Sequence, residues 1–476
     1  MLFNSFEYFL FLPLIAVLYY LLPHRYRWAL LLPASYFFYM YWRPEYGLLL
    51  LISTAIDYWA ALWMNRKKDK KARRPYLWLS LVANLSLLIS FKYLGFINES
   101  IREIFSVFDF GSTPSQFDIL LPVGISFYTF QTLSYTIDVY RGRRPPEKHF
   151  GIFALYVSFF PQLVAGPIER STTLLPQFHR SVHFDINRIL NGSKLFAYGL
   201  FKKIILADTL SIYVYQIFKN PGIYDSPTLI LGVAAFGYQL YLDFSAYTDM
   251  AIGSAQILGF DLMSNFERPT RAKSVREFWS RWHISLTTWF FDYVYRPMAK
   301  NWRWPWYVNI IIVFALIGLW HGAGWDFLLF GLVNAFGYIV SLWIDEMSLA
   351  HRVFDHKWIK KGIQLFQIAF TYVTLGFSLV FFRANGVVAA WQYLQAFFGN
   401  FFIPFSGITL ASLDAFLLLT GWPLFLLVQW QKNFNSKAPL NAIKPWWLRW
   451  GVYYYLLFYL IFFGGRFLKE FIYFQF

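Results

Sequence analysis

The stretch of sequence that decides the fold reads VNIIIVFALIGLWHGAGW and covers residues 308–325. Its first 13 residues are apolar except for Asn309. As a helix they would measure about 20 Å at ~1.5 Å per residue, which is short of the ~30 Å hydrocarbon core of a bilayer. Gly318, Gly322 and Gly324 bracket His321, so helix continuity is weakest there and another backbone or a substrate can approach closely. Because a helix break at membrane depth is tolerated only where it is buried in protein or lines a watered cavity, we predict that His321 lies at the blind end of a tunnel.

The rest of the chain is typical of a protein with many membrane helices. Of its 476 residues, 58% are hydrophobic and only 14% are charged, too few to cover the surface of a water-soluble globule. Apolar runs alternate with charge-rich connectors, which favours an all-α, polytopic membrane protein with about eleven or twelve membrane segments, some of them short or re-entrant. The predicted segments are Phe6–Leu22, Trp28–Tyr41, Tyr46–Met64, Leu77–Tyr93, Leu120–Tyr140, Gly151–Val164, Leu195–Ile217, Leu229–Leu258, Val308–Trp343, Ile363–Phe382, Leu413–Trp430 and Gly451–Gly464.

No repeat and no long polar linker divides the chain, so we predict a single membrane domain over residues 1–476. Its N-terminal spans occupy residues 1–150, its catalytic core residues 151–345, and its C-terminal spans residues 346–476. The segment Phe178–Lys194 mixes charged and apolar residues, and we expect it to form an interfacial amphipathic helix.

Composition excludes several kinds of function. The chain has no cysteine, so thiolate catalysis, disulfides and cysteine-ligated metals are excluded. The net charge of +16 comes from Lys and Arg in short connectors, which favours contact with anionic lipid over binding of nucleic acid. His321 and His283 stand 38 positions apart with no third His in that region and no HExxH spacing, so we expect no metal and no bound cofactor.

Ionisable residues within apolar surroundings are the candidates for chemistry, because buried charge is costly unless it has a partner or lines a cavity. A neutral imidazole at His321 is suited to taking a proton from an attacking hydroxyl, although a packing histidine between glycines would give the same pattern. His283 lies in the segment Ser274–Tyr293. This segment is too polar to span the membrane and too aromatic to be a free loop, which indicates a helix that lies in the membrane interface or dips into the membrane. An amphipathic surface helix, with His283 and both arginines reaching the lipid headgroups, also explains this segment.

Basic and acidic residues near these histidines allow two interpretations each. Arg276, Arg281 and Lys273 could hold the phosphates of an anionic donor, or reach the lipid headgroups. Asp243 and Asp249 follow a strongly apolar run. They could pair with arginines such as Arg268 or Arg271, or orient a histidine.

An ordered set of motifs resembles the membrane-bound O-acyltransferase family, in the bacterial branch that serves alginate O-acetylation. The motifs are FPQLVAGPI at residues 160–168, LDFSAYTD at 242–249, FWSRWHIS at 278–285 and WHG at 320–322, and the similarity extends over nearly the whole chain. The tripeptide is weakly specific by itself, whereas the ordered set is strongly specific.

The resemblance implies a bowl-shaped helical fold with a central tunnel, whose deepest point holds His321, and it assigns the upstream polar position to His283. Its implied activity is transfer of an acetyl group from a cytoplasmic thioester, acetyl-CoA, through the bacterial inner membrane to a hydroxyl of an extracytoplasmic polysaccharide. A periplasmic acetyltransferase and the exopolysaccharide machinery are the implied partners. Further motif residues become candidates for substrate or donor binding: Trp320, Asp243, Tyr247, Arg276, Arg281, Trp282, Asn265 and Arg268.

Two other readings stay open at the level of sequence. The same fold could transfer D-alanine to teichoic acid or a fatty acyl chain to a lipid or protein, and a long acyl chain would need an apolar lateral slot. A polymer or lipid transporter could instead use a buried histidine to relay protons. The sequence names neither the polymer nor the oligomeric state.

Overall fold

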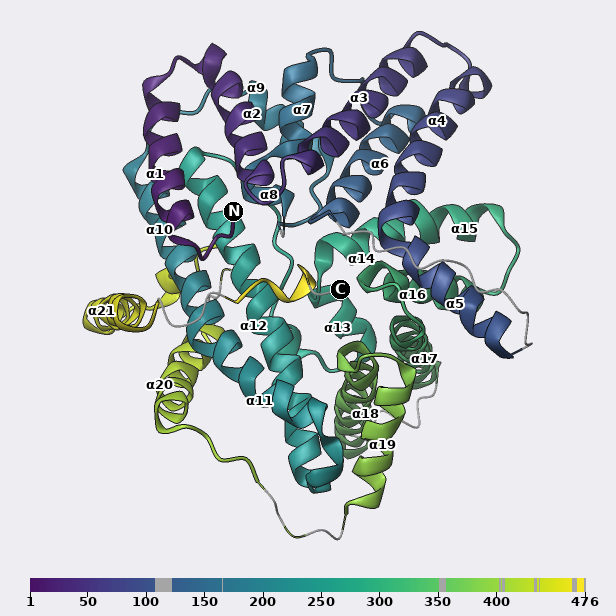
Figure 1. The fold of residues 1–476 in the computed structure, drawn as a ribbon, viewed down its shortest axis with the longest axis vertical. Coiled ribbons are helices and arrows are strands. Elements are labelled where there is room, and N and C mark those ends of the chain that lie inside the picture. Colours follow the sequence, from purple (N-terminus) through teal and green to yellow (C-terminus); the bar gives the residue numbers. More distant parts are fainter. Residues whose placement is uncertain are drawn as a thin grey trace. The chain divides into compact units, whose positions relative to one another are not determined.

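The fold is seen in a computed structural model of the chain (Figure 1). The structure describes residues 1–107, 122–164, 166–350, 357–401, 404, 407–431, 435, 437–464 and 469–474. Within these ranges every regular element is helical, so the predicted all-α fold is confirmed. The chain divides into two compact units. Unit 1 contains Met1–Phe196 and Met250–Met263, and unit 2 contains Ala197–Asp249 and Ser264–Phe476. That both belong to a single domain stays a prediction.

Unit 1 contains the first nine α-helices. They are α1 (Phe6–Leu21), α2 (His24–Met40), α3 (Glu45–Asn65), α4 (Lys70–Leu88), the π-helical turn η1 (Ile89–Tyr93), α5 (Leu94–Val107), α6 (Ile125–Arg141), α7 (Phe150–Ser158), α8 (Phe160–Leu163) and α9 (Ser171–His179). Two helices contribute residues to both units, α10 (Ile186–Phe201) and α12 (Ser226–Leu258).

Unit 2 contains the remaining elements. They are η2 (Lys202–Ala207), α11 (Asp208–Lys219), η3 (Pro221–Ile223), η4 (Pro269–Arg271), α13 (Val275–Arg281), α14 (Ile284–Phe290), η5 (Phe291–Tyr295), α15 (Arg296–Asn301), α16 (Trp306–His321), α17 (Trp325–Ala350), α18 (Lys357–Arg383), α19 (Val387–Gly399), α20 (Ser412–Gln429), η7 (Pro439–Ala442), α21 (Trp446–Phe463) and η8 (Ile472–Phe474). Of these, η2 and η5 are π-helical and the other η elements are 3₁₀ turns.

A buried polar network joins three helices of unit 1. The carboxylate of Asp57 on α3 accepts hydrogen bonds from Ser80 and Asn84 on α4 and from Thr136 on α6. All four side chains are buried. A buried carboxylate stabilises a fold only when such donors replace its lost hydration, so this network fixes α3, α4 and α6 against one another.

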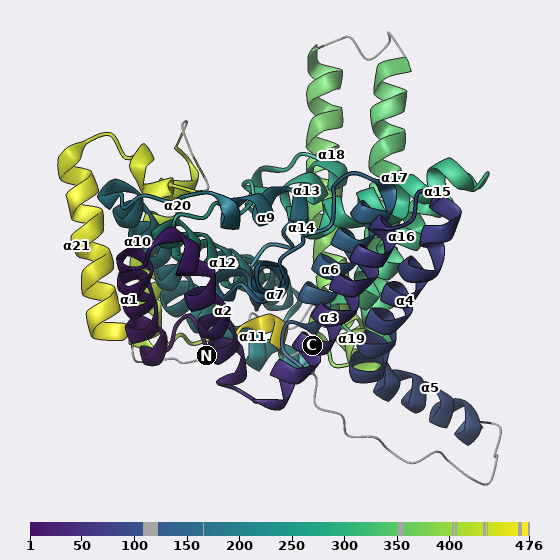
Figure 2. The ribbon, with the colours of Figure 1, turned by 90° about the horizontal axis from the view of Figure 1, so that it is seen from above.

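Unit 2 positions the histidines through a close helical hairpin. The antiparallel pair α16 and α17 approach closely because glycine stands at the contact. A Cβ added at Gly318 would overlap the carbonyl oxygen of Phe327, and one at Gly331 would overlap the carbonyl oxygen of Phe314. Helix α17 also packs along α18, and Figure 2 shows the two long helices side by side.

Six helical stretches in the described part of the chain are long and apolar enough to cross a membrane. They are Glu45–Asn65, Lys70–Ser106, Ser226–Leu258, Trp325–Glu346, Trp358–Arg383 and Ser412–Gln429. Three shorter apolar helices accompany them: Phe6–Leu21, Phe150–Leu163 and Trp306–His321. The chain is therefore a multi-pass membrane protein, whereas the total of eleven or twelve segments stays a prediction.

Two predicted helices are wrong in detail. Phe178–Lys194 is not one amphipathic helix, because α9 ends at His179 and α10 begins at Ile186 after an extended stretch. The Asp185 carboxylate accepts hydrogen bonds from the backbone of Asn187 and Arg188, which caps the new helix start. Ser274–Tyr293 is likewise divided, into α13, α14 and η5, with the first break at His283.

Candidate active site

His321 is the last residue of α16. The next residue, Gly322, is extended with φ −154° and ψ 151°, and α17 begins three residues later at Trp325. The helix thus breaks where the short apolar run and its glycines predicted a break. A Cβ at Gly322 would overlap the ring of Phe327, so the connection after the histidine is as crowded as the hairpin itself. His321 is only 2% exposed.

His283 lies at the joint between α13 and α14. Its backbone is left-handed, with φ 43° and ψ 52°, and Arg268, with φ 49°, is the only other non-glycine residue of positive φ in the described chain. A left-handed backbone in an L-residue costs roughly 1–2 kcal/mol, and such strained residues concentrate at functional sites. The side chain of His283 is completely buried.

Asn265 fixes the backbone immediately after His283. Its carbonyl oxygen accepts a hydrogen bond from the Ile284 amide at 3.0 Å. Its side-chain Oδ1 accepts a second from the Ser285 hydroxyl at 2.6 Å, and its Nδ2 donates to the Thr248 hydroxyl at 3.4 Å. Asn265 therefore holds the start of α14, and with it the joint that carries the imidazole.

Both imidazoles belong to one group of rings, called here the histidine cluster: His283, His321, Trp320 and Tyr473. The centroids of the two imidazoles lie 6.2 Å apart, and the Trp320 ring lies 5.4 Å from His283 and 5.0 Å from His321. The Tyr473 ring lies 5.5 Å from His321 and 6.4 Å from His283. The structure thus brings together the two candidate histidines, which stand 38 positions apart in the sequence.

Apolar rings surround the cluster and set its electrostatics. Phe244 packs edge-on against His283 at 4.6 Å, and Phe382 and Phe330 pack against His321 at 5.3 and 5.7 Å. His283 lies between two short helices outside the membrane-spanning segments, and burial lowers its pKa to about 3. At neutral pH its imidazole is therefore uncharged.

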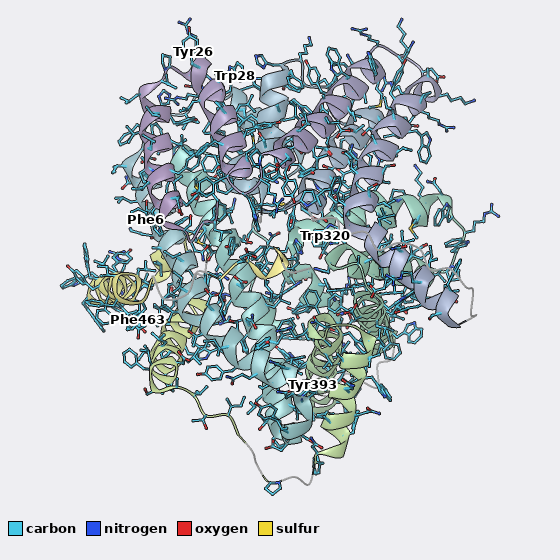
Figure 3. The ribbon with its side chains drawn as sticks, viewed as in Figure 1. Phe6, Tyr26, Trp28, Trp320, Tyr393 and Phe463 are labelled. Atoms are coloured by element: carbon cyan, nitrogen blue, oxygen red, sulfur yellow. The ribbon has the colours of Figure 1, made fainter. Side chains whose placement is uncertain are left out.

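A cavity of about 720 Å³ within unit 2 reaches the histidine cluster. His321 and Tyr473 line it together with Trp279, Trp282 and Asn334, and its remaining wall is mostly apolar side chains of α12, α18 and α19. Figure 3 labels Trp320, the neighbour of His321, and Tyr393 of α19, which also lines the cavity and lies well apart from Trp320 in that view. The cavity has the size of a small-molecule site.

The predicted donor-binding arginines lie in other surroundings. Arg281 forms a 2.7 Å ion pair with Glu277, and Arg276 a longer one, 3.9 Å, with Asp345; both arginines are partly exposed. The guanidinium of Arg268 donates to the carbonyl oxygen of Gln431. The side chains of Arg281 and Arg276 are thus engaged at the surface of α13, where binding of a donor phosphate would compete with carboxylates.

The two aspartates of the LDFSAYTD motif are paired with lysines, not with Arg268 or Arg271 as one prediction had it. Asp249 forms a 2.8 Å ion pair with Lys202, and Asp243 forms a 2.9 Å ion pair with Lys203. Asp243 also accepts a hydrogen bond from the Ile472 amide at 2.9 Å. The role of Asp243 in orienting a histidine stays a prediction.

Three residues of this region escaped the sequence analysis. Lys202 and Lys203 interrupt the apolar run of residues 195–217, and two buried cations in a predicted span were a signal that the search for ionisable groups could have used. Tyr473 carried no such signal, because it follows an apolar run in a chain with 33 tyrosines. Only the packing of residues distant in sequence reveals its place.

Comparison with known proteins finds a matching family and several relatives. Residues 147–383 match the model of MBOAT, the membrane-bound O-acyltransferase family. The probable alginate O-acetylase AlgI of Pseudomonas aeruginosa is 39% identical over 82% of this chain and 73% of its own length. The peptidoglycan O-acetyltransferase of Helicobacter pylori is 32% identical over 77% of this chain and 72% of its own length. The teichoic acid D-alanyltransferase of Streptococcus thermophilus is 25% identical over 67% and 80%.

Proposed function

Because the chain belongs to the membrane-bound O-acyltransferase family, we propose that it moves an acetyl group from cytoplasmic acetyl-CoA across the bacterial inner membrane for the O-acetylation of an extracytoplasmic polysaccharide. The observation that carries the proposal is the histidine cluster, in which buried His321 ends a broken helix beside His283 and lines a cavity of about 720 Å³. The chain is an O-acyltransferase; the acetyl group, its donor and its acceptor are the proposed parts.

His321 acts as the general base. It takes the proton of an attacking hydroxyl while the hydroxyl oxygen forms a bond to the thioester carbonyl carbon, and the carbon–sulfur bond then breaks. The proton held by the imidazole passes to the leaving thiolate, which departs as CoA thiol. Neutral His283, 6.2 Å away between ring centroids, positions the donor or the acceptor.

The chemistry of the cluster limits any covalent intermediate. The chain has no cysteine, so an acetyl group held by the protein would need an oxygen or nitrogen nucleophile. Within the histidine cluster those are the imidazoles and the buried hydroxyl of Tyr473. Direct transfer to the acceptor needs neither.

A polysaccharide acceptor is supported by the relatives, whose names specify alginate and peptidoglycan. Both polymers present sugar hydroxyls, which fits a base that deprotonates a hydroxyl. We propose a periplasmic acetyltransferase and the exopolysaccharide machinery as partners, because a membrane-embedded site alone would have to admit a bulky polymer.

A second candidate is transfer of a longer acyl chain. The cavity of about 720 Å³ is mostly apolar and far larger than an acetyl group, so it offers the lateral slot that a fatty acyl chain would need. Turnover of acyl-CoA donors with two to sixteen carbons distinguishes the candidates. An acetyl transferase prefers the shortest donor, and a fatty acyl transferase prefers a long one.

The absence of cysteine makes a direct assay possible. The purified protein in lipid nanodiscs is given acetyl-CoA and alginate or peptidoglycan fragments, and a thiol reagent then reports released CoA with no signal from the protein. We expect His321→Ala to lower thiol release about 10²- to 10⁴-fold, the usual contribution of a general base. His183→Ala, at an exposed position, is the control. Unchanged thiol release by His321→Ala at normal expression would overturn the proposed role.

A further inference from the structure

The segment from Lys469 to Tyr473 forms part of the wall of the active site. It follows α21 in sequence and is drawn in yellow in Figure 1, directed away from α21 toward α14. Tyr473 contacts both imidazoles, and the Phe471 ring lies 4.4 Å from Tyr247 and 5.6 Å from Phe244, the residue packed on His283. The position of this segment therefore decides the shape of the histidine cluster.

Two oppositely charged side chains hold the backbone of this segment. The Lys203 ammonium lies 2.9 Å from carboxylate oxygens of both Asp208 and Asp243, and it also donates to the carbonyl oxygen of Glu470 at 3.1 Å. The second oxygen of Asp243 accepts from the Ile472 amide at 2.9 Å. The pair thus holds one acceptor and one donor of the segment's backbone.

Burial leaves these two charged side chains without alternative hydrogen-bond partners in the solvent. Lys203 is 1% exposed and Asp243 is 3% exposed, so neither group can exchange its protein partners for bulk water. A buried ion that loses a hydrogen bond pays a large desolvation cost. A hydrogen bond to a charged group changes an equilibrium by roughly ten- to a hundredfold, so losing one would raise the population of the undocked segment by that factor.

The π-helical turn η2 explains how two successive lysines serve different purposes. Lys202 and Lys203 open this turn, and π-turns in α-helices often mark functional positions. Lys202 pairs with Asp249 and donates to the Ser245 hydroxyl at 2.7 Å. Lys202 is thus as buried as Lys203 and paired with the same helix α12, but its hydrogen bonds go to side chains of α12 instead of the segment 469–473.

We propose that Lys203 and Asp243 are positioning residues of the acyl-transfer site, which hold the backbone at Glu470 and Ile472 so that Tyr473 closes the wall beside His321. The part of this inference that concerns catalysis rests on the proposed function. The docking of the segment does not rest on the proposed function, and thiol labelling measures it independently of activity.

A pair of substitutions at Ile472 tests the backbone contact without changing any charge. Ile472→Pro removes the amide hydrogen that Asp243 accepts, and residue 472 is the first of the 3₁₀ turn η8, where proline is well tolerated. Ile472→Ala removes the side chain and keeps the amide. We expect Ile472→Pro to lower acyl transfer at least tenfold and Ile472→Ala to lower it less than threefold.

Docking is measured by labelling with a thiol reagent. In a protein without cysteine, Phe471→Cys introduces a single thiol at a fully buried position, and the rate of its reaction with N-ethylmaleimide reports exposure of the segment. We expect at least a tenfold faster reaction when Ile472→Pro or Lys203→Met is added. Ile472→Ala and Lys202→Met should leave the rate unchanged, although Lys202→Met also leaves a buried carboxylate unpaired.

The outcomes separate the two proposals. Unchanged labelling with both Ile472→Pro and Lys203→Met would overturn the positioning role, as would faster labelling with intact acyl transfer. Equal acceleration by Lys202→Met would overturn it too, because the effect would then be general destabilisation. Faster labelling confined to Ile472→Pro and Lys203→Met, in a parent protein that transfers no acyl group, would support the docking contact and reject the proposed function.

Discussion

The left-handed backbone at His283 gives a quantitative prediction. Replacing His283 with Gly or with Ala removes the same imidazole, so the loss of ring packing is nearly equal in the two variants. They differ in the backbone: at φ 43° Ala retains a strain of about 1–2 kcal/mol that Gly does not have. Gly loses about 0.4–1 kcal/mol through the greater freedom of the unfolded chain. The Gly variant should therefore be more stable than the Ala variant by about 0.5–1 kcal/mol.

Thermal unfolding followed by tryptophan fluorescence measures this difference, since the chain has 21 tryptophans. At about 2.1 cal/mol/K of unfolding entropy per residue, a chain of 476 residues shifts its midpoint by about 0.5–1 °C for this difference in stability. The exposed helical position Arg276 supplies the control, because Gly within a helix is about 1 kcal/mol less stable than Ala and the order reverses. Arg268, with φ 49°, should repeat the order found at His283.

Activity should respond differently from stability. Both variants lack the imidazole that packs beside His321, so we expect both to lose most of their acyl transfer, whichever is the more stable. If the Ala variant at 283 unfolds at the higher temperature, the backbone is not strained there. If either variant retains full activity, His283 has no part in binding or positioning.

Three further predictions concern single sites. Gly318→Ala should prevent close packing of α16 on α17 and lower the yield of folded protein severalfold. Gly362→Ala is the control, because a Cβ there meets no atom within 4 Å. Equal yields of the two variants by fluorescence-detected gel filtration would contradict this prediction. Tyr473→Phe keeps the ring that contacts His321, so transfer close to the parent rate would exclude the hydroxyl from the reaction. A loss of at least tenfold, which we expect if His321 acts on that hydroxyl, would assign it a direct part. Asp57→Ala should destabilise unit 1 by about 2–4 kcal/mol because it leaves buried donors unpaired, and thermal midpoints equal to those of Asp57→Asn would refute that reasoning.

The break at His321 could be predicted because its cause is local. A 13-residue apolar run cannot cross the bilayer, and glycines on both sides of the histidine allow the chain to turn and the helices to approach. Length and glycine spacing are properties of one segment, so they can be read without knowing what packs against it.

The joint at His283 could not be predicted in the same way. Nothing in Ser274–Tyr293 stops a helix by its intrinsic propensity, and no proline or glycine stands there. The break depends on Asn265, whose backbone and side chain hold the amides and hydroxyl that open α14. Such a contact between segments distant in sequence overrides local preference, so the helix was predicted whole.

The positions of Lys203 and Tyr473 were hidden for a related reason. A sequence shows which charges are buried in apolar runs, but it does not show which opposite charge each one meets. Arginines nearer in sequence were therefore one of the two interpretations for Asp243, whereas the structure pairs it with Lys203. Tyr473 lies in the segment whose backbone Lys203 and Asp243 hold, so its position beside His321 depends on contacts that the sequence does not show.

The histidine cluster draws its rings from the helix joint at 283, the helix end at 320–321 and the segment around 473, and between the last two lie α17 to α21. Membrane chains are synthesised and inserted from the N-terminus, and earlier parts fold first. The two histidines can therefore meet while more than a hundred residues are still to be made, but their wall is completed only after α20 and α21 have been inserted. In the proposed mechanism the site is therefore complete only when α20, α21 and the segment around Tyr473 have been made, and a chain arrested before α20 would hold both histidines without the Tyr473 ring that packs against them.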